Sequence, residues 1–515
     1  MAKNKDKNAL ELNVSLKTLA RTSIIVLVGV ILSKIFSYVY RIIVARYFGP
    51  EVYGLFSIAT MILGLFVTVF SLGLVDGLLR FISIYRGKDE KEKINYLLKF
   101  SLVCLTISGV IAGVLLFAFS NFIALNLFRD IALVFYLKVF SFLIILSILL
   151  NTCLGILRAY ERAGEYSFFQ NISQNAIKIV LLFLFIFLGF NADNTIIFSF
   201  FLGVFITLIG AYIFCRKIIA GIFIKSSLKK SEKKEIRSSF FLYCWPIIFL
   251  GVISSFFGWI DSFAIGYFMS LEYVGFYNAA LPIATLLSVA PDIFMQLFFP
   301  MINKGFIGKK YVMIKELSKQ VQKWIFIINL PVLLMILIFP GVIINLLFGA
   351  NYLVAENSLR ILAIGLFFMS LSQTSIHLLS MLGKSKIALI NVVVCSVINV
   401  ALNILLIPLY GLVGAALATA ISSIILGGAF IIQVGSNIKI YPFRRKMIRI
   451  TLVSLIPTGL LIYLNRLLSP TILNMLLSGI LFGLSYLFLI IVTGCLDKND
   501  IGIITAFRKK IFGSN

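Results

Sequence analysis

Apolar residues occur along the chain in long runs, and short polar loops separate each run from the next. Each run approaches the 20 or so residues that an α-helix needs to cross a hydrocarbon core roughly 30 Å thick. The runs are continuous rather than alternating, so they predict helices and not a transmembrane β-barrel. We therefore expect an all-α integral membrane protein with fourteen spans, near residues 22–46, 53–79, 97–121, 132–157, 167–188, 195–215, 239–267, 275–299, 324–347, 358–381, 387–407, 412–433, 448–465 and 473–495.

The Lys and Arg residues of the loops predict the orientation of these spans. Alternate loops carry nearly all of these residues, whereas the remaining loops carry almost none, only Arg129 and Arg466. Because basic loops stay in the cytoplasm, we place both termini there, in a multi-pass protein of the cell membrane. The N-terminus leads to no small-residue cleavage site, so we interpret the first run as a retained span.

Composition excludes several classes of protein. The chain has 515 residues, of which 61% are hydrophobic and 13% charged, and its net charge is +26. The basic residues lie mainly between spans, where they contact lipid headgroups, so we expect membrane lipids and no nucleic acid as partners. Six cysteines stand singly and there is one histidine, so the sequence predicts no metal site.

A weak internal repeat divides the chain. "VYRIIVARYFGPEVYGLFSIA" (39–59) has an echo in "WIDSFAIGYFMSLEYVGFYNAA" (259–280), where Gly54 matches Gly275. The repeat has six spans, so its two copies share one orientation. We expect a cytoplasmic N-terminus (1–21), a first six-helix lobe (22–215), a cytoplasmic linker (216–238), a second lobe (239–433), a cytoplasmic loop (434–447), helices 13 and 14 (448–495) and a cytoplasmic C-terminus (496–515).

Three cations lie at positions where a membrane helix rarely carries charge. Lys34 is near the midpoint of the first span, and Arg41 follows at i+7 on the same face. Lys178 is near the midpoint of the fifth span. Because a charge at the bilayer centre costs at least ~2.5–3.5 kcal/mol, such residues usually face a cavity or a partner. Arg46 is nearer a helix end, where its side chain can reach the headgroups.

Amides and carboxylates accompany these cations. Asn171, Gln174 and Asn175 form a polar stripe with Lys178, at spacings that place all four on one helix face. Hydrogen bonding between helices would also explain such a stripe. In the second half, Asn399 and Asn403 are one turn apart, Asp261 matches Arg41 in the repeat, and Asp292 follows a proline.

Three segments resemble a known family. "SKIFSYVYRIIVARYFGPEVYGLFSIA" is similar to the first-hairpin signature of polysaccharide-export flippases, and the echo at 259–280 is similar to their seventh-to-eighth span signature. "NVALNILLIPLYGLVGAALATAIS" (399–422) resembles their hairpin of spans 11 and 12. The family is the polysaccharide-transporter, or O-antigen-type flippase, branch of the multidrug/oligosaccharidyl-lipid/polysaccharide exporter superfamily.

This resemblance implies two six-helix lobes in a V around a central cavity, followed by two C-terminal helices. It also implies a flippase that moves a polyprenyl-phosphate- or pyrophosphate-linked oligosaccharide from the inner to the outer leaflet. The chain has no Walker-type loop, which agrees with transport that uses no ATP of its own. We expect no cofactor, with H⁺ or Na⁺ as a candidate coupling ion, and a monomer that can work beside glycan-assembly enzymes.

The charges suggest a division of roles among these residues. We expect Lys34, Arg41 and Lys178 to hold the phosphates, and Asn171, Gln174, Asn175, Asn399 and Asn403 to hydrogen-bond the sugars. Asp261 and Asp292 are candidates for gating or coupling, with Asp261 pairing with Arg41 when the outer side closes. Substrate phosphate would then compete for that arginine, which would give the substrate different affinities for two states.

Three other functions fit parts of the pattern. A cation-coupled multidrug exporter would use Asp261 and Asp292, although the deep charges of the first lobe are cations. A lipid II or spore-wall precursor flippase of the same superfamily fits the same residues. A membrane glycosyltransferase would need carboxylates and a long outer loop. The outer loops are short, so we expect a transporter without catalytic residues and not an enzyme.

Overall fold

A computed structural model describes residues 2–218, 228–308, 311–439, 441, 443–467 and 471–495. All regular elements in these ranges are helical, and no strand occurs in them, as the sequence predicts. The predicted C-terminus at 496–515 and the middle of the predicted linker, 219–227, lie outside the described residues.

Thirteen helical segments of the described chain are long and apolar enough to cross a membrane. The predicted count of fourteen is therefore not confirmed. The difference lies in Lys34–Phe70, which is one segment by length but contains the second half of the predicted first span and most of the predicted second span. Gly49 interrupts the helix there with φ 88° and ψ 175°, a conformation that favours glycine, and Pro50 follows it.

The contacts of the chain divide it into two compact units, residues 1–279 and 280–515. In the first unit, α8 packs against α1 and α2, so this unit extends beyond the predicted first lobe, whose boundaries stay a prediction. Its elements are α1 (Ala2–Phe70), α2 (Leu74–Gly87), α3 (Lys91–Phe122), the π-helix η1 (Ile123–Leu127), α4 (Ala132–Ala159), α5 (Ala163–Ser167), the π-helix η2 (Phe168–Ser173), α6 (Gln174–Phe187), α7 (Ala192–Ile218), α8 (Lys230–Phe268) and most of α9 (Leu271–Ala284).

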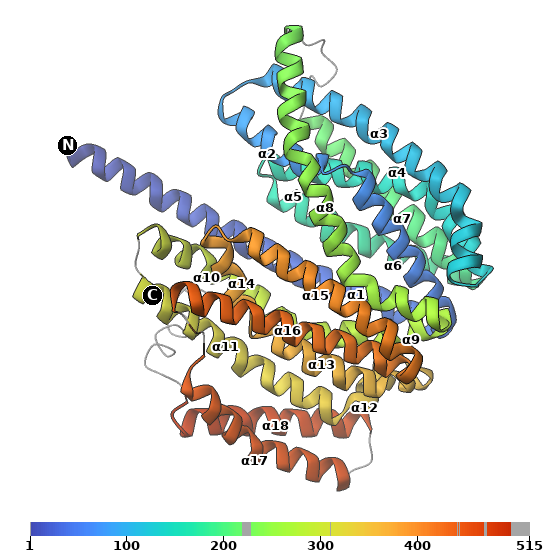
Figure 1. The fold of residues 1–515 in the computed structure, drawn as a ribbon, viewed down its shortest axis with the longest axis vertical. Helices are drawn as coiled ribbons and strands as arrows, with labels where there is room; N and C mark the ends of the chain where they lie inside the picture. Colours follow the sequence, from blue (N-terminus) through green and yellow to red (C-terminus); the bar gives the residue numbers. More distant parts are fainter. Residues whose placement is uncertain are drawn as a thin grey trace. The chain divides into compact units, whose positions relative to one another are not determined.

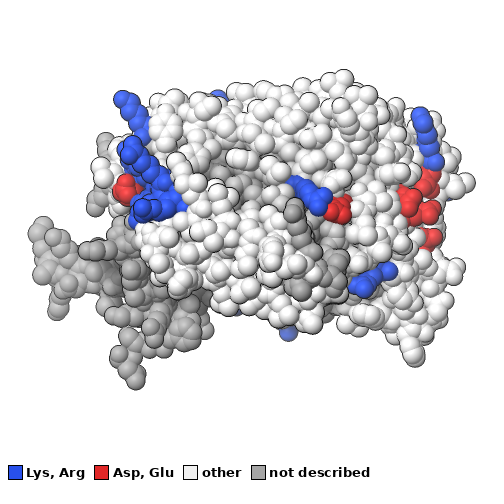
Figure 2. All heavy atoms as spheres, turned by 90° about the horizontal axis from the view of Figure 1, so that it is seen from below, with Lys and Arg blue, Asp and Glu red and all other residues white. Residues whose placement is uncertain are grey.

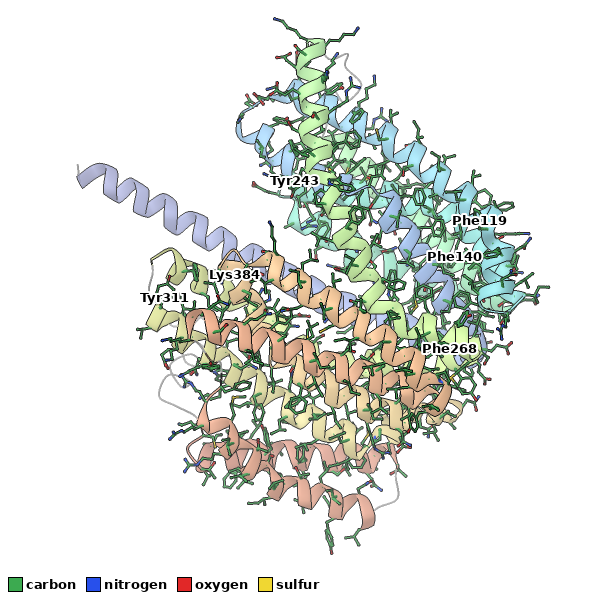
Figure 3. The ribbon with its side chains drawn as sticks, viewed as in Figure 1. Phe119, Phe140, Tyr243, Phe268, Tyr311 and Lys384 are labelled. Carbon is green, nitrogen blue, oxygen red and sulfur yellow. The ribbon has the colours of Figure 1, made fainter. Side chains whose placement is uncertain are left out.

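Helix α4 is the centre of the first unit. It packs against α1, α2, α3 and α7, and most of its residues have little exposed surface. Figure 1 shows α4 behind α3 and beside α7. By contrast, α3 and α6 expose a row of large apolar side chains, such as Val114, Phe119 and Phe187, as expected for helices that face lipid. Figure 3 shows Phe119 at the outside of α3.

The second unit contains the end of α9 and the following elements: the 3₁₀-helix η3 (Thr285–Ser288), α10 (Val289–Ile307), α11 (Tyr311–Ile338), α12 (Pro340–Leu347), the 3₁₀-helix η4 (Ala350–Ala355), α13 (Glu356–Ser370), α14 (Gln373–Met381), α15 (Ser385–Tyr410), α16 (Leu412–Ile438), α17 (Arg445–Leu467) and α18 (Ile472–Val492).

Small residues on α16 organise the second unit. This helix packs against α13, α14 and α15 through a buried face of glycine, alanine and serine. Within a membrane, small residues let helix backbones approach closely and gain van der Waals contact. Helices α17 and α18 pack on each other and on α11 and α12, where Phe339, Leu461, Met475 and Phe482 form a small buried cluster.

The two copies of the sequence repeat meet inside the first unit, at the hairpin in α1 and the turn between α8 and α9. A Cβ atom built on Gly54 would overlap the carbonyl oxygen of Leu271, and one built on Gly275 would overlap that of Pro50. Because Gly54 matches Gly275 in the repeat, each copy makes the same contact with the other. Reciprocal contacts of this kind are what a local two-fold arrangement of the two hairpins would produce.

Charged side chains are sparse over the described surface that Figure 2 shows. Lys, Arg, Asp and Glu appear there in a few small groups, and the remaining described surface is uncharged. A surface of this kind, on helices long enough to cross a bilayer, is that of a multi-pass membrane protein.

Candidate functional site

Lys178 lies inside the first unit with only 5% of its surface exposed. The side chain extends from the first turns of α6 toward α7, and its Nζ lies 3.7 Å from the centre of the Phe200 ring. Gly203 makes room for it, since a Cβ atom on that glycine would lie 2.5 Å from Lys178 Cγ. The lysine is thus buried in the protein, and the helix opposite is shaped around it, whereas its depth in the membrane stays a prediction.

An aromatic cluster of Tyr40, Phe56, Phe140 and Phe200 surrounds this contact. Phe200 stacks on Phe140 with ring centres 5.5 Å apart and meets Phe56 edge-on, also at 5.5 Å. Phe56 in turn meets Tyr40 at 5.9 Å. The four rings come from both parts of α1, from α4 and from α7, and Figure 3 labels Phe140. A cation held over such a ring without water gains about 2 kcal/mol or more.

Arg41 brings a second positive charge to the edge of this cluster. It is an exposed residue, it lies within hydrogen-bonding reach of the Tyr53 hydroxyl, and it interacts electrostatically with Lys178. The Tyr53 hydroxyl donates its own hydrogen bond to the carbonyl of Asn278, at 3.1 Å, which leaves its oxygen free to accept from the guanidinium. Two like charges repel strongly where water is scarce, so an anion between them would be favoured.

Lys34 precedes Arg41 by two turns of α1 and is half-buried. The structure brings Arg41 and Lys178 together and leaves Lys34 further along the same helix. That Lys34 forms part of a phosphate site stays a prediction.

The polar stripe around Lys178 begins in a π-helix. Asn171 is buried in η2, where its side-chain amide donates to Ser167 Oγ at 3.1 Å, and Asn175 donates to the Asn171 carbonyl at 3.3 Å. Gln174 is half-buried and opens α6. The wider turn of a π-helix occurs often at functional sites, and the residue spacing alone gave no sign of it.

Asp261 lies on α8 and accepts a hydrogen bond from the Tyr277 hydroxyl at 2.7 Å. Tyr277 occupies the repeat position of Phe56, so the pair Asp261 and Tyr277 stands where the first copy has Arg41 and Phe56. The two copies therefore share a hairpin but carry opposite charge. Pairing of Asp261 with Arg41 when the outer side closes stays a prediction.

In the second unit, Asn399 and Asn403 lie between α15 and α16 with 2% and 1% of their surfaces exposed. Asn399 donates to Thr419 Oγ1 at 3.4 Å, and Asn403 donates back to the Asn399 carbonyl at 3.0 Å. The first bond joins α15 to α16 and the second lies within α15, and the role of both amides toward sugars stays a prediction. Asp292 lies on α10 and interacts electrostatically with His377 on α14, a pair that the sequence did not indicate.

Several residues of interest gave no signal in the sequence. Phe200 is one of 49 phenylalanines, and nothing in its neighbourhood distinguishes it. Lys323 is fully buried in α11, although the predicted span began just after it. Helix α11 begins at Tyr311, so Lys323 lies inside the helix and not at its end. A predicted helix that also included the amphipathic residues before the apolar run would have contained Lys323.

Comparison with known proteins identifies the family. The model of the polysaccharide biosynthesis protein family matches residues 19–306, more than half of the chain. The chain belongs to this family. A second family model, MatE, matches residues 246–405. Both fit the superfamily that the three sequence segments resemble.

Curated relatives of this family member include transporters and flippases. A putative O-antigen transporter of Shigella flexneri is 28% identical over 74% of this chain and 89% of its own length. The probable low-salt glycan biosynthesis flippase Agl15 of Haloferax volcanii is 26% identical over 51% of this chain and 55% of its own. The lipid II flippase MurJ of Bacillus subtilis is 23% identical over 79% of this chain and 80% of its own.

Solved structures confirm the fold. The lipid II flippase MurJ in an inward closed conformation superposes with a TM-score of 0.71, at 19% identity, over 90% of this chain and 98% of that one. An inward-facing multidrug resistance MATE transporter of the MOP superfamily gives a TM-score of 0.64, at 18% identity, over 81% and 98%. The chain is therefore a multi-pass membrane protein with the fold that these transporters share.

Proposed function

We propose that this protein is a flippase that carries a polyprenyl-phosphate- or pyrophosphate-linked oligosaccharide from the inner to the outer leaflet by alternating access. The names of its relatives support this substrate class, since they include an O-antigen transporter and a glycan biosynthesis flippase. A transporter rather than a catalytic enzyme is the role that these relatives favour.

The observation that carries the proposal is the pair of cations in the first unit. Arg41 and Lys178 interact with each other, and among the described residues neither forms an ion pair with a carboxylate. Two neighbouring positive charges inside the membrane-spanning part, without a counter-ion, repel each other. An anion bound near both of them would reduce this repulsion. The phosphate of a lipid-linked glycan supplies this anion, with one negative charge when the link is a phosphodiester and two when it is a pyrophosphate.

The other predicted residues complete this proposal. Lys34 extends the positive charge along α1, and Asn171, Gln174 and Asn175 offer hydrogen bonds to sugar hydroxyls next to Lys178. Asn399 and Asn403 are proposed to do the same in the second unit. Asp261 and Asp292 are proposed for gating or coupling, driven by a gradient of H⁺ or Na⁺. Both termini are placed in the cytoplasm.

A lipid II-type precursor is the second candidate substrate, because the curated relatives include a lipid II flippase that is 23% identical over 79% of this chain. That precursor has the same anionic and polyprenyl chemistry, so the cations of the first unit serve either glycan. A cationic drug, by contrast, would be repelled by Arg41 and Lys178.

Flipping by purified protein in liposomes tests the proposed substrate class. The probes are a fluorescent polyprenyl-pyrophosphate-linked N-acetylglucosamine and a cationic dye, each with and without a proton or sodium gradient. We expect movement of the anionic lipid-linked sugar and none of the dye. Export of the dye without flipping of the lipid would contradict the proposal.

A further inference from the structure

Helix α1 ends at Phe70, inside the second span that the sequence predicts, and three residues separate it from the start of α2. Gly73 is the last residue before α2, and its φ is 63°. A Cβ atom on Gly73 would lie 2.5 Å from the carbonyl oxygen of Cys244 on α8. Only glycine combines that φ with that approach. Interrupted membrane helices are tolerated where their backbone is buried in protein or lines a cavity, and often lie at binding sites.

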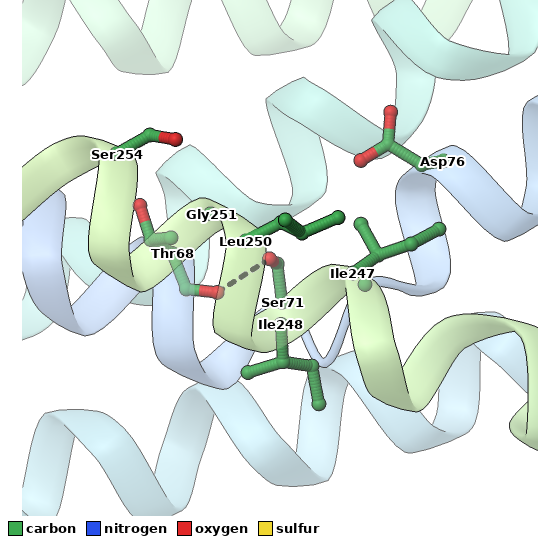
Figure 4. A pocket seen from close by; sticks show the side chains of 9 residues that line it. Thr68, Ser71, Asp76, Ile247, Ile248, Leu250, Gly251 and Ser254 are labelled. Atoms are coloured by element: carbon green, nitrogen blue, oxygen red, sulfur yellow. Dashed lines mark hydrogen bonds between the residues drawn. The ribbon is translucent and has the colours of Figure 1, made fainter. Parts of the chain in front are cut away.

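A pocket of about 290 Å³ opens beside this break, wholly within the first unit. Thr68 and Ser71 line it from the end of α1, Asp76 from the first turn of α2, and Gly251 and Ser254 from α8. Figure 4 shows Asp76 and Ser254 at opposite sides, with the apolar side chains of Ile247 and Leu250 between them.

The polar groups of this pocket are mainly acceptors. Thr68 Oγ1 donates to the Gly64 carbonyl at 2.8 Å and Ser71 Oγ donates to the Thr68 carbonyl at 3.0 Å, so both oxygens keep lone pairs for a ligand. The carboxylate of Asp76 makes no hydrogen bond or ion pair with any residue in the described part of the chain. Arg80, one turn away, lies instead over the Tyr243 ring at 4.2 Å.

We propose that this pocket is a sugar subsite, in which Asp76, Thr68 and Ser71 accept hydrogen bonds from the hydroxyls of one residue of the glycan. The inference rests on the proposed function and adds a site that none of the predicted sugar-binding residues touches. A sugar ring presents hydroxyl donors at its edge and C–H groups on its face, which match the acceptors and the two apolar side chains.

Size and spacing favour a sugar over a cation. The volume would hold roughly ten waters, at about 30 Å³ each, and approaches the lower limit of small-molecule pockets. One carboxylate at the edge of such a space provides no compact cage of oxygens for a metal ion. A neutral ligand with several donors fills the space and uses the separated acceptors together.

Saturation-transfer NMR on the full-length protein tests this subsite. The protein is kept in a detergent without sugar groups, and the probes are free galactose and free N-acetylglucosamine. We expect saturation of the ring protons in the wild type. Asp76→Asn should weaken the binding about tenfold, as for a lost hydrogen bond to a charged acceptor.

Two glycine variants on α8 provide a matched pair. A Cβ atom on Gly251 would lie 3.1 Å from Thr68 Cγ2, whereas one on Gly258, two turns further, meets nothing within 4 Å. Gly251→Ala should narrow the pocket and reduce the sugar signal, while Gly258→Ala should keep it. Thermal unfolding of each variant shows whether the fold is retained.

Binding of inorganic pyrophosphate, followed by phosphorus NMR, separates this inference from the proposed function. Asp76→Asn should leave pyrophosphate binding unchanged, and Arg41→Gln should weaken it. Sugar binding that is absent in the wild type, or equal in Asp76→Asn, overturns the subsite, as does displacement of the sugar by choline or Na⁺. Pyrophosphate binding that Arg41→Gln leaves intact counts instead against the proposed function.

Discussion

Lys178 shows how one residue can hold a charge inside a membrane protein. Its stem crosses Gly203, and its ammonium group lies over Phe200 at 3.7 Å. The ring compensates for part of the hydration that the ammonium group loses on burial. Arg41 repels this group and does not act as its counter-ion. The residue is therefore held in position without being neutralised by an acidic partner in the described part of the chain.

Lys178→Met keeps the length of the side chain and removes its charge. Because an unpaired buried charge opposes folding, we expect thermal stability equal to or above that of the wild type, together with slower flipping. Thermal unfolding in detergent and the liposome assay measure the two effects. A variant that is less stable by several degrees would show that the charge itself stabilises the fold.

Gly203→Ala tests the space that the lysine occupies. The added methyl would overlap Lys178 Cγ, and overpacking of this kind costs about 1–3 kcal/mol. Gly258→Ala is the control, because its methyl meets nothing within 4 Å. We expect a lower unfolding temperature for the first variant alone, and equal temperatures would refute the close packing of α6 on α7.

At the scale of helices, the central contact of the first unit joins the two copies of the repeat. Gly54 and Gly275 each give the other hairpin room for its backbone, and Tyr53 donates a hydrogen bond to the Asn278 carbonyl across the same contact. The alternative of a chance sequence match does not explain why matched glycines make matched contacts.

Gly54→Ala and Gly275→Ala should each destabilise the protein by about 3 kcal/mol, because a methyl group would strike a carbonyl oxygen and not a movable side chain. The double variant should cost less than the sum, since one substitution already separates the hairpins. Thermal unfolding of all three proteins measures this, with Gly428→Ala on α16 as an open-space control. Additive losses would indicate two independent contacts.

The sequence predicts the elements better than it predicts their interruptions. The apolar runs place the helices, and the charges of Lys34, Arg41 and Lys178 mark one half of the chain. The break at Gly73 and the π-helix before Gln174 have no comparable signal, because both depend on what the backbone packs against. The sequence also gives no signal for Phe200, because only the fold brings its ring next to Lys178.

At the scale of the whole molecule, the fold is that of MurJ and MATE transporters, and the chain belongs to the polysaccharide biosynthesis protein family. A shared fold does not fix the substrate, because flippases and multidrug exporters both use it. Substrate choice depends on the side chains of the site, and we propose that the informative ones here are two cations, Arg41 and Lys178.

The most direct test of this claim is the rate at which the double variant Arg41→Gln/Lys178→Met flips a polyprenyl-pyrophosphate-linked sugar in liposomes. The control is Arg46→Gln, which removes an exposed arginine from the same hairpin. We expect the double variant to be slower by about tenfold or more, as for the loss of charge-assisted hydrogen bonds to phosphate, and the control to keep its rate. Flipping by the double variant at the wild-type rate would contradict recognition of the phosphates by these two residues.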